Sequence, residues 1–203
     1  QIGMLTYLQG TSRPDITMAV HQAARFINDP KLSHERAVHR IARYLKATKD
    51  KGIIYNPKSV KGVECYVDAD FAGGWDKADS GNPEAVLSRT GYVLMYANCP
   101  VLWCSKLQTE IALSTTEAEY IALSQSMREV IPFITLLQEV DKVFSTNTNK
   151  ARFHCKIFEV NNSCISLAKL EKFSPRTEHI ALKYHHVRRF ILDNTVEIFP
   201  IDT

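Results

Sequence analysis

The sequence lacks the patterns that mark zinc-binding, disulfide-stabilised and membrane-spanning proteins. No CxxC pair occurs and no Cys/His cluster has zinc-like spacing, so a structural zinc site is not expected. The odd number of cysteines, at irregular spacing, indicates reduced thiols in an intracellular protein, and leaves cytoplasm and nucleus equally open. No apolar run approaches the ~20 residues of a membrane span, so we expect no membrane partner.

What is present is an ordinary globular composition with an uneven distribution of charge. The 203 residues are 45% hydrophobic and 23% charged, and the net charge is +3. Residues 1–58 carry 10 Lys/Arg against 4 Asp/Glu, residues 59–149 carry 6 against 12, and residues 150–203 carry 9 against 6. Basic arms around an acidic centre suit a protein that grips a polyanion near a bound cation. Basic helix faces that simply meet solvent would give the same counts.

The first 58 residues are predicted to be helical. Ser12 and Pro14 are typical of a helix start, and apolar residues at helical spacing follow as far as Ile27. Asp29-Pro30 ends this helix, and Ser33 is expected to cap a second helix that runs to about residue 48.

The second helix carries a basic stripe opposite its apolar side. Its members, spaced three or four residues apart, are Arg36, Arg40, Arg43 and Lys46. Such a stripe can follow a phosphate backbone, and each contact would make binding more salt-sensitive. The three arginines are therefore candidate nucleic-acid-binding residues, although a solvated face explains the pattern as well.

The rest of the chain predicts a sheet flanked by helices. Strands are expected at 62–69, 90–97, 101–106, 156–160 and 196–201, and helices at 115–140, 163–170 and 179–194. Pro132 should kink or divide the longest helix, and the polar segment 73–88 should be a surface loop. Three strands, a helix, a strand, a helix and a last strand argue for an α/β fold with a mixed sheet. Several such folds fit this order.

Two acidic residues occupy positions suited to metal binding. Asp68 ends an apolar strand at a turn, and Glu119 lies at the start of the long helix, where Glu117 is at capping-box spacing from Ser114. Clustered carboxylates are the ligands that paired Mg²⁺ ions require. A solvated strand-end Asp and a first-turn Glu favoured by the helix dipole would leave the same residues without a metal.

Several longer motifs carry a family resemblance that covers nearly the whole chain. Segments that resemble the region joining a reverse transcriptase to its ribonuclease H are Ile2–Leu8, Arg13–Ile16 and Arg43–Thr48. Segments that match ribonuclease H motifs in order are Asp68–Gly73, Ser88–Tyr92, Trp103–Lys106, Ser114–Leu123, Asn161–Lys169 and Arg176–Arg188. Together they resemble the C-terminal part of the Pol polyprotein of copia-type LTR retrotransposons.

The resemblance implies two domains and a specific chemistry. Residues 1–58 resemble the thumb or connection of a reverse transcriptase, and residues 62–203 resemble a ribonuclease H-like domain with a mixed five-stranded sheet flanked by helices. Family members hydrolyse the RNA strand of an RNA–DNA hybrid with two Mg²⁺ ions. The implied metal-binding and catalytic residues are Asp68 and Glu119, and Lys106 and Arg188 are implied phosphate contacts. The implied partners are the hybrid, or another nucleic acid, and the remainder of the Pol polyprotein.

Two of the four acids in the family pattern are replaced in this chain. Val160 stands at the third position and Ala181 at the fourth, and neither side chain can ligate a cation. Glu159 is adjacent to the third position, but neighbouring strand side chains point to opposite faces, so it would need a register slip or a bulge to take part. His179 and His185 lie near the fourth position, yet imidazole is a poor ligand for Mg²⁺.

The sequence therefore predicts a ribonuclease H-like fold with weak or absent Mg²⁺ binding and severely weakened or absent hydrolysis. The paired-aspartate motif of the polymerase does not occur, so we expect no DNA synthesis by this segment. Three functions stay open: an active hybrid ribonuclease, a catalytically dead nucleic-acid-binding domain, and a decayed transposon fragment without activity. A hybrid-cleavage assay separates the first from the others, and salt-dependent hybrid binding separates the second from the third.

Overall fold

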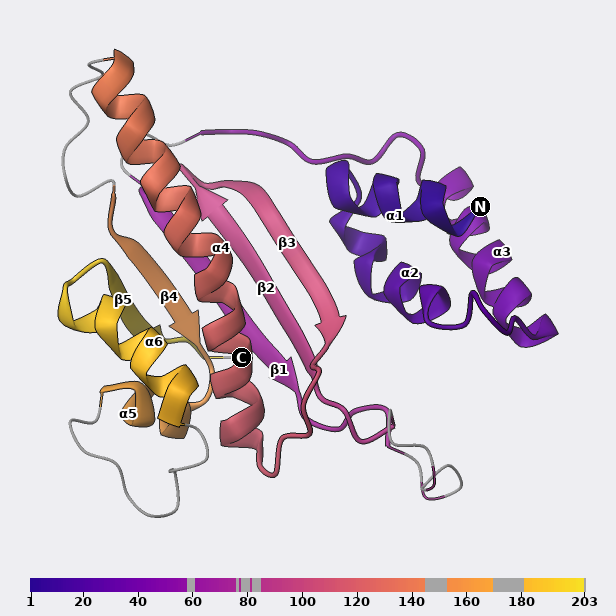
Figure 1. Cartoon of the computed structure of the whole chain (residues 1–203). Coiled ribbons are helices and arrows are strands. Elements are labelled where there is room, and N and C mark those ends of the chain that lie inside the picture. Colours follow the sequence, from indigo (N-terminus) through magenta and orange to yellow (C-terminus); the bar gives the residue numbers. More distant parts are fainter. Residues whose placement is uncertain are drawn as a thin grey trace.

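In the computed structural model, a mixed β-sheet with a layer of helices on one face stands beside a group of N-terminal helices (Figure 1). The structure describes residues 1–57, 61–75, 77, 81, 85–144, 153–169 and 181–202, without the side chains of 181–185. Within this part of the chain no helix is long and apolar enough to cross a bilayer.

Five strands form a single sheet in the order β3-β2-β1-β4-β5. They are β1 Val63–Asp70, β2 Arg89–Tyr96, β3 Cys99–Leu107, β4 Cys155–Glu159 and β5 Val196–Pro200. The first three pair antiparallel as a meander, whereas β4 pairs parallel to β1 and β5 parallel to β4. The predicted mixed five-stranded sheet is confirmed.

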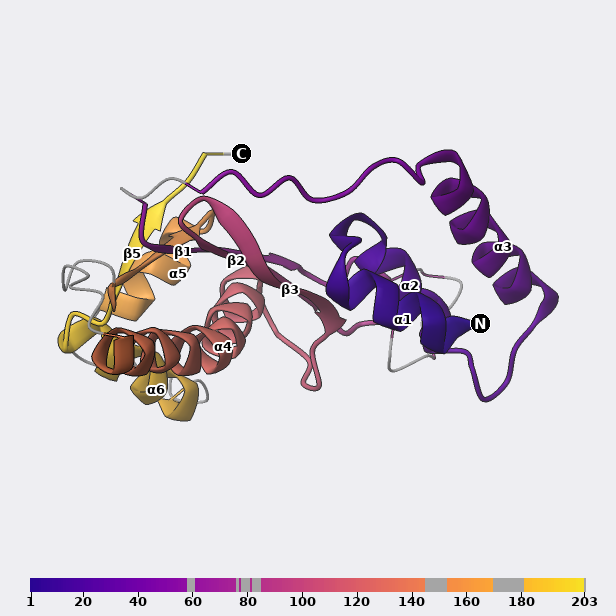
Figure 2. The same cartoon turned by 90° about the horizontal axis from the view of Figure 1, so that it is seen from above.

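One face of the sheet is buried under three helices, α4 Thr115–Phe144, α5 Asn162–Lys169 and α6 Ala181–Leu192. Figure 2 shows these helices gathered on the same side of the strands. Alternate residues of β1, namely Val63, Cys65 and Val67, are almost fully buried on this side. Because side chains alternate along a strand, the intervening residues of β1, including Asp68, belong to the opposite face.

The β2–β3 connection is tighter than the sequence indicated. Ala97 and Asn98 both have left-handed backbone angles, φ 50° and 71°, and they form a two-residue hairpin turn. The strand expected at 101–106 therefore begins two residues earlier, because β3 already starts at Cys99. Pro100 is tolerated there near the start of an edge strand.

The long helix α4 runs without a break from Thr115 to Phe144, so Pro132 does not divide it. The lost backbone hydrogen bond is outweighed by packing on both sides of the proline, since Val130 and Ile134 are 0% and 2% exposed against the sheet.

The N-terminal helices are α1 Ile2–Thr11, the short 3₁₀ helix η1 Pro14–Ile16, α2 Thr17–Ala24 and α3 Leu32–Ala47. They lie beyond the β3 edge of the sheet (Figures 1 and 2) and share a small core of their own. The indole Nε1 of Trp103 donates a hydrogen bond of 2.7 Å to the carbonyl of Gln9, which ties β3 to α1.

The expected cap at Ser33 is wrong, because α3 already begins at Leu32. The N-cap residue is Lys31, whose N–H donates to His34 Nδ1 at 3.0 Å.

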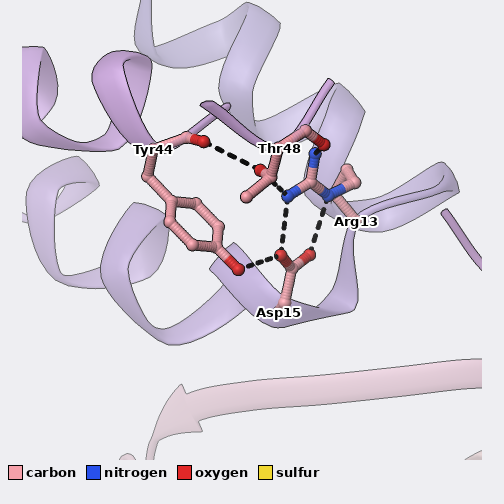
Figure 3. A network of polar contacts seen from close by, with 4 residues as sticks. All are labelled: Arg13, Asp15, Tyr44 and Thr48. Atoms are coloured by element: carbon pink, nitrogen blue, oxygen red, sulfur yellow. Dashed lines mark hydrogen bonds and ion pairs between the residues drawn. The ribbon is translucent and has the colours of Figure 1, made fainter. Parts of the chain in front are cut away.

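A polar network fastens the end of α3 to η1 (Figure 3). The guanidinium of Arg13 donates to both carboxylate oxygens of Asp15, at 2.9 and 2.7 Å, and to Thr48 Oγ1 at 2.7 Å. The hydroxyl of Tyr44 donates to the same Asp15 carboxylate at 2.8 Å. These hydrogen bonds, of which the one from Arg13 has the largest effect, lower the pKa of Asp15 to about 2.

Whether residues 1–58 and 62–203 form two domains stays a prediction, because residues 58–60 lie outside the described part of the chain.

Candidate functional site

Asp68 lies near the end of the central strand β1, where its register partner on β2 is Gly91. Gly91 in turn pairs with Ser105 on β3, so these three positions share one face of the sheet. The side chain of Asp68 is exposed on that face.

Glu119 is held by the capped first turn of α4. Ser114 Oγ accepts the N–H of Glu117 at 3.1 Å, and the Glu117 carboxylate accepts the N–H of Leu113 at 2.8 Å, which confirms the predicted cap. Gln108, 1% exposed, donates from Nε2 to the carbonyl of Ala118 at 2.8 Å and thereby joins the β3 end to this turn. The same Nε2 also donates to Thr90 Oγ1 at 3.2 Å, so this buried donor links the helix start to the sheet, while its Oε1 atom is buried without a partner.

Glu119 and Glu159 are both buried carboxyl groups, 8% and 0% exposed. Burial raises the pKa of Glu119 to about 8, and the charges of Glu159 and Asp68 add to this effect. Burial likewise raises the pKa of Glu159 to about 7, with Asp68 contributing, while the N–H of Asn161 donates to Glu159 Oε1 at 3.1 Å and opposes the shift. The Oε2 atom of each glutamate is buried without a hydrogen-bond partner. Both side chains therefore favour the protonated form near neutral pH.

Glu159 and Val160 point to opposite sides of the sheet. Glu159 is the register partner of Val67 and shares its buried face, toward α4. Val160 instead lines a groove of about 450 Å³ on the other face, together with Asp68 and Gly91. The position that the resemblance assigns to the third acid thus presents an isopropyl group to the groove that Asp68 borders.

Asp70 follows Asp68 on the same strand face but turns toward the next loop. Its carboxylate occupies the space that a Cβ on Gly73 would fill. We therefore do not count Asp70 as a substitute ligand for the missing acid.

The described residues do not fit a pair of Mg²⁺ ions. In this part of the chain, no three His, Cys, Asp or Glu side chains converge closely enough to hold a metal ion. Two dications a few ångströms apart need several converging oxygen ligands, and here the third position is Val160. The assignment of Asp68 and Glu119 as metal-binding and catalytic residues stays a prediction.

The fourth family position is described only as backbone. Ala181 is the first residue of α6, and its side chain is outside the described set, as are His179 and the side chain of His185. No substitution of its neighbours for the missing acid can be derived from this segment.

The candidate nucleic-acid-binding residues lie on three separate elements. Arg36, Arg40 and Arg43 are exposed along α3, Lys106 is exposed near the end of β3, and Arg188 is half-buried on α6. The three arginines form a continuous stripe, as the spacing predicted, whereas the other two contribute from the sheet and from its helical layer. Their role in binding stays a prediction.

Sequence reasoning placed Glu159 on the face opposite Val160, but it did not predict that Glu159 and Arg89 would be the most deeply buried charged residues of the described part of the chain. Glu159 follows Cys155 and Ile157 at period two, a pattern that could have placed it on the core face. Arg89 lies within the motif Ser88–Tyr92 and is 6% exposed where β2 begins. No local sequence signal distinguishes it from a surface arginine.

Comparison with known proteins agrees with this architecture. No protein-family model matches the chain. The chain is 34% identical over 207 residues to the retrovirus-related Pol polyprotein from transposon TNT 1-94 of Nicotiana tabacum, a match that covers 100% of the chain and 14% of that relative. It is 31% identical over 202 residues to the Pol polyprotein from transposon RE1 of Arabidopsis thaliana, covering 100% of the chain and 13% of that relative.

A solved structure gives a fold-level likeness over the entire chain. The foamy viral protease-reverse transcriptase in complex with double-stranded DNA superposes with a TM-score of 0.54 and 10% identity, covering 100% of this chain and 31% of that one. The chain spans only about 14% of the length of the first Pol relative. The sequence identity extends over the whole of this chain, and the strands form a sheet in the order β3-β2-β1-β4-β5. The chain therefore belongs to the copia-type retrotransposon Pol polyprotein family, as a segment with a ribonuclease H-like fold.

Proposed function

We propose that this chain is a ribonuclease H-like domain that binds RNA–DNA hybrids and hydrolyses them very slowly or not at all. The observation that carries the proposal is the position of Val160, which lines the same groove as Asp68 at the place of the third family acid. An isopropyl group supplies no ligand for a cation and no charge for the developing transition state.

The electrostatics of the two buried glutamates support the same reading. Burial and neighbouring carboxylates favour protonated Glu119 and Glu159 at neutral pH. A carboxyl group that keeps its proton is a weak ligand for Mg²⁺, because the cation must compete with the proton for the same oxygens. Since catalysis in this family consists largely of charge placement, loss of two ligands should lower the rate by orders of magnitude.

Hybrid binding is supported by the exposed basic stripe of α3. Arg36, Arg40 and Arg43 point into solvent rather than into an ion-pair network, so they are available to phosphates. The remainder of the Pol polyprotein is the proposed protein partner of the segment, given that the chain is a small part of its relatives' length.

A cleavage assay on an RNA–DNA hybrid tests the loss of activity. We expect no product above background with Mg²⁺ or Mn²⁺, and the same result for Asp68→Asn. Turnover that Asp68→Asn abolishes would overturn the proposal and identify an active ribonuclease.

A binding assay on the same hybrid tests the retained function. We expect affinity that falls steeply with salt, as several phosphate contacts require. Absence of binding at low salt would identify a decayed fragment without activity.

A further inference from the structure

Among the residues that the structure describes, Arg89 is a buried cation without an acidic partner. Its Nη1 atom lies 3.4 Å from His21 Nδ1 and 3.5 Å from Ser105 Oγ, while its Nη2 atom is buried and has no hydrogen-bond partner. Across the described residues no ion pair joins a carboxylate to this guanidinium. Asp70, its register partner on β1, acts on it only at longer range.

Other basic side chains surround Arg89 at the seam between α2 and the β2–β3 hairpin. His21 comes from α2, Arg25 is the C-cap residue of that helix, and Lys106 comes from β3. Burial lowers the pKa of His21, and the charges of Arg89, Arg25 and Lys106 lower it further. His21 therefore lies in the positive field of three basic side chains at this seam, and Arg25 also acts on Arg89.

An unpaired buried guanidinium is costly. Transfer of a charge out of water is unfavourable, and a buried donor without an acceptor adds to this cost. A negatively charged group with several acceptor oxygens removes both costs at once. The planar fork of an arginine fits the oxygens of a phosphate in a bidentate manner.

We propose that Arg89, with the positive charges of Arg25 and Lys106 nearby, forms an oxyanion site that takes a phosphate group between α2 and the β2–β3 hairpin. The phosphate is either a free ion or a phosphodiester of a nucleic acid.

The adjoining groove provides access to this site. Ser105, which contacts Arg89, lines the groove of about 450 Å³ together with Thr17, whose buried Oγ1 atom also lacks a partner. Three acidic groups, Asp15, Asp68 and Asp202, line the groove as well, so the anion is expected near the Ser105 side. The site uses neither the metal position nor the α3 stripe, and it stands independently of hybrid hydrolysis.

Thermal unfolding of the 203-residue chain tests the site with inorganic phosphate as the probe. Phosphate and chloride are compared at matched ionic strength, because general screening then cancels. We expect the Tm of the wild type to rise with phosphate in a saturable way, as for any ligand that binds only the folded state. The exposed Arg128 serves as the matched control, and Arg128→Met should behave as the wild type.

Arg89→Met should abolish this phosphate-dependent rise. In chloride its Tm should equal or exceed that of the wild type, because methionine fills the space without a buried charge. A wild type without a phosphate-specific rise, or an equal rise in Arg89→Met, would overturn the proposal. A lower Tm for Arg89→Met in chloride with no phosphate effect in the wild type would show a purely structural arginine.

The exposed Lys106 keeps the test decisive if Arg89→Met does not fold. Lys106→Met should weaken phosphate binding severalfold, because it removes a nearby positive charge rather than a direct contact. An unchanged phosphate affinity would then count against the site.

Binding of an RNA–DNA hybrid distinguishes the two sources of phosphate. If the site takes a phosphodiester, Arg89→Met lowers hybrid affinity by about tenfold and inorganic phosphate competes with the hybrid. If it takes free phosphate alone, hybrid affinity is unchanged while the phosphate-dependent rise in Tm persists in the wild type. Failure of hybrid binding altogether would refute the proposed function and leave the phosphate result intact.

Discussion

Burial and the neighbouring carboxyl group of Glu159 raise the pKa of Glu119 to about 8. The two groups come from the start of α4 and the end of β4, which the sheet brings together across forty residues of chain. Glu159 itself has a pKa of about 7, raised first by burial. A pair of this kind holds protons in the folded state that the unfolded chain would release.

This pair predicts that stability falls with rising pH between about 4.5 and 8. In that interval the folded state binds more protons than the unfolded state, so the free energy of unfolding decreases as pH rises. Each unit of pKa difference corresponds to about 1.4 kcal/mol. Urea unfolding at a series of pH values in metal-free buffer measures the slope.

Glu119→Gln and Glu159→Gln should each flatten this dependence, because the amide has no proton to lose. Glu139→Gln, on the exposed side of α4, is the matched control and should keep the wild-type slope. An equal slope in all four proteins would contradict the assignment of the effect to the buried pair.

Val160→Asp should make the stability of the chain depend on divalent cations. Without metal, a new carboxylate beside Asp68 adds repulsion and lowers the Tm. Mg²⁺ or Mn²⁺ should restore the Tm, because a cation bound to the folded state stabilises it. Val160→Asn supplies the same shape without the charge, and a similar cation response in this variant would contradict the prediction.

The network of Figure 3 predicts a local effect of Arg13→Gln on the N-terminal helices. The change removes the bonds from Arg13 to Asp15 and Thr48, and the expected loss is about 1 kcal/mol once solvent screening of the half-exposed Asp15 is allowed for. Hydrogen exchange should quicken in α3 while the amides of β1 keep their protection. Uniformly faster exchange across the sheet would show that the network supports the whole molecule.

The arginine stripe predicts the salt dependence of hybrid binding. Replacing Arg36, Arg40 and Arg43 by Gln should reduce the slope of log affinity against log salt by about 2 to 3, if each contacts one phosphate. Fluorescence anisotropy titrations at salt concentrations from about 50 to 300 mM measure this slope. The single variant Arg128→Gln carries an exposed charge change elsewhere and should leave the slope as it is.

The sequence was sufficient for the sheet because its strands have clear periodicity and punctuation. Apolar residues alternate with others along β1 at Val63, Cys65 and Val67. Local signals for the neighbouring elements are Gly91 and the helix-capping Ser114. It was insufficient where tertiary packing overrides a local signal. Pro132 is a strong helix breaker in isolation, yet Val130 and Ile134 hold the helix against the sheet on either side.

The candidate site shows the same limit. The motifs around Asp68 and Glu119 locate both residues at the ends of elements, as expected. Arg89 differs, because its surroundings depend on α2 packing beside β3, which brings His21 to Arg89 from 68 positions away, and no local pattern encodes such a contact.

The parallel pairing of β1 with β4 has a consequence for shortened copies of this chain. A version that ended after α4 would keep the β1–β2–β3 meander but leave one side of the central strand without its backbone partners. An unpaired, largely apolar strand edge of this kind is a template for addition of a second chain. Copies of this chain that end after α4 are therefore expected to self-associate through β1. Their concentration in a cell would be limited by aggregation rather than by the loss of catalytic activity.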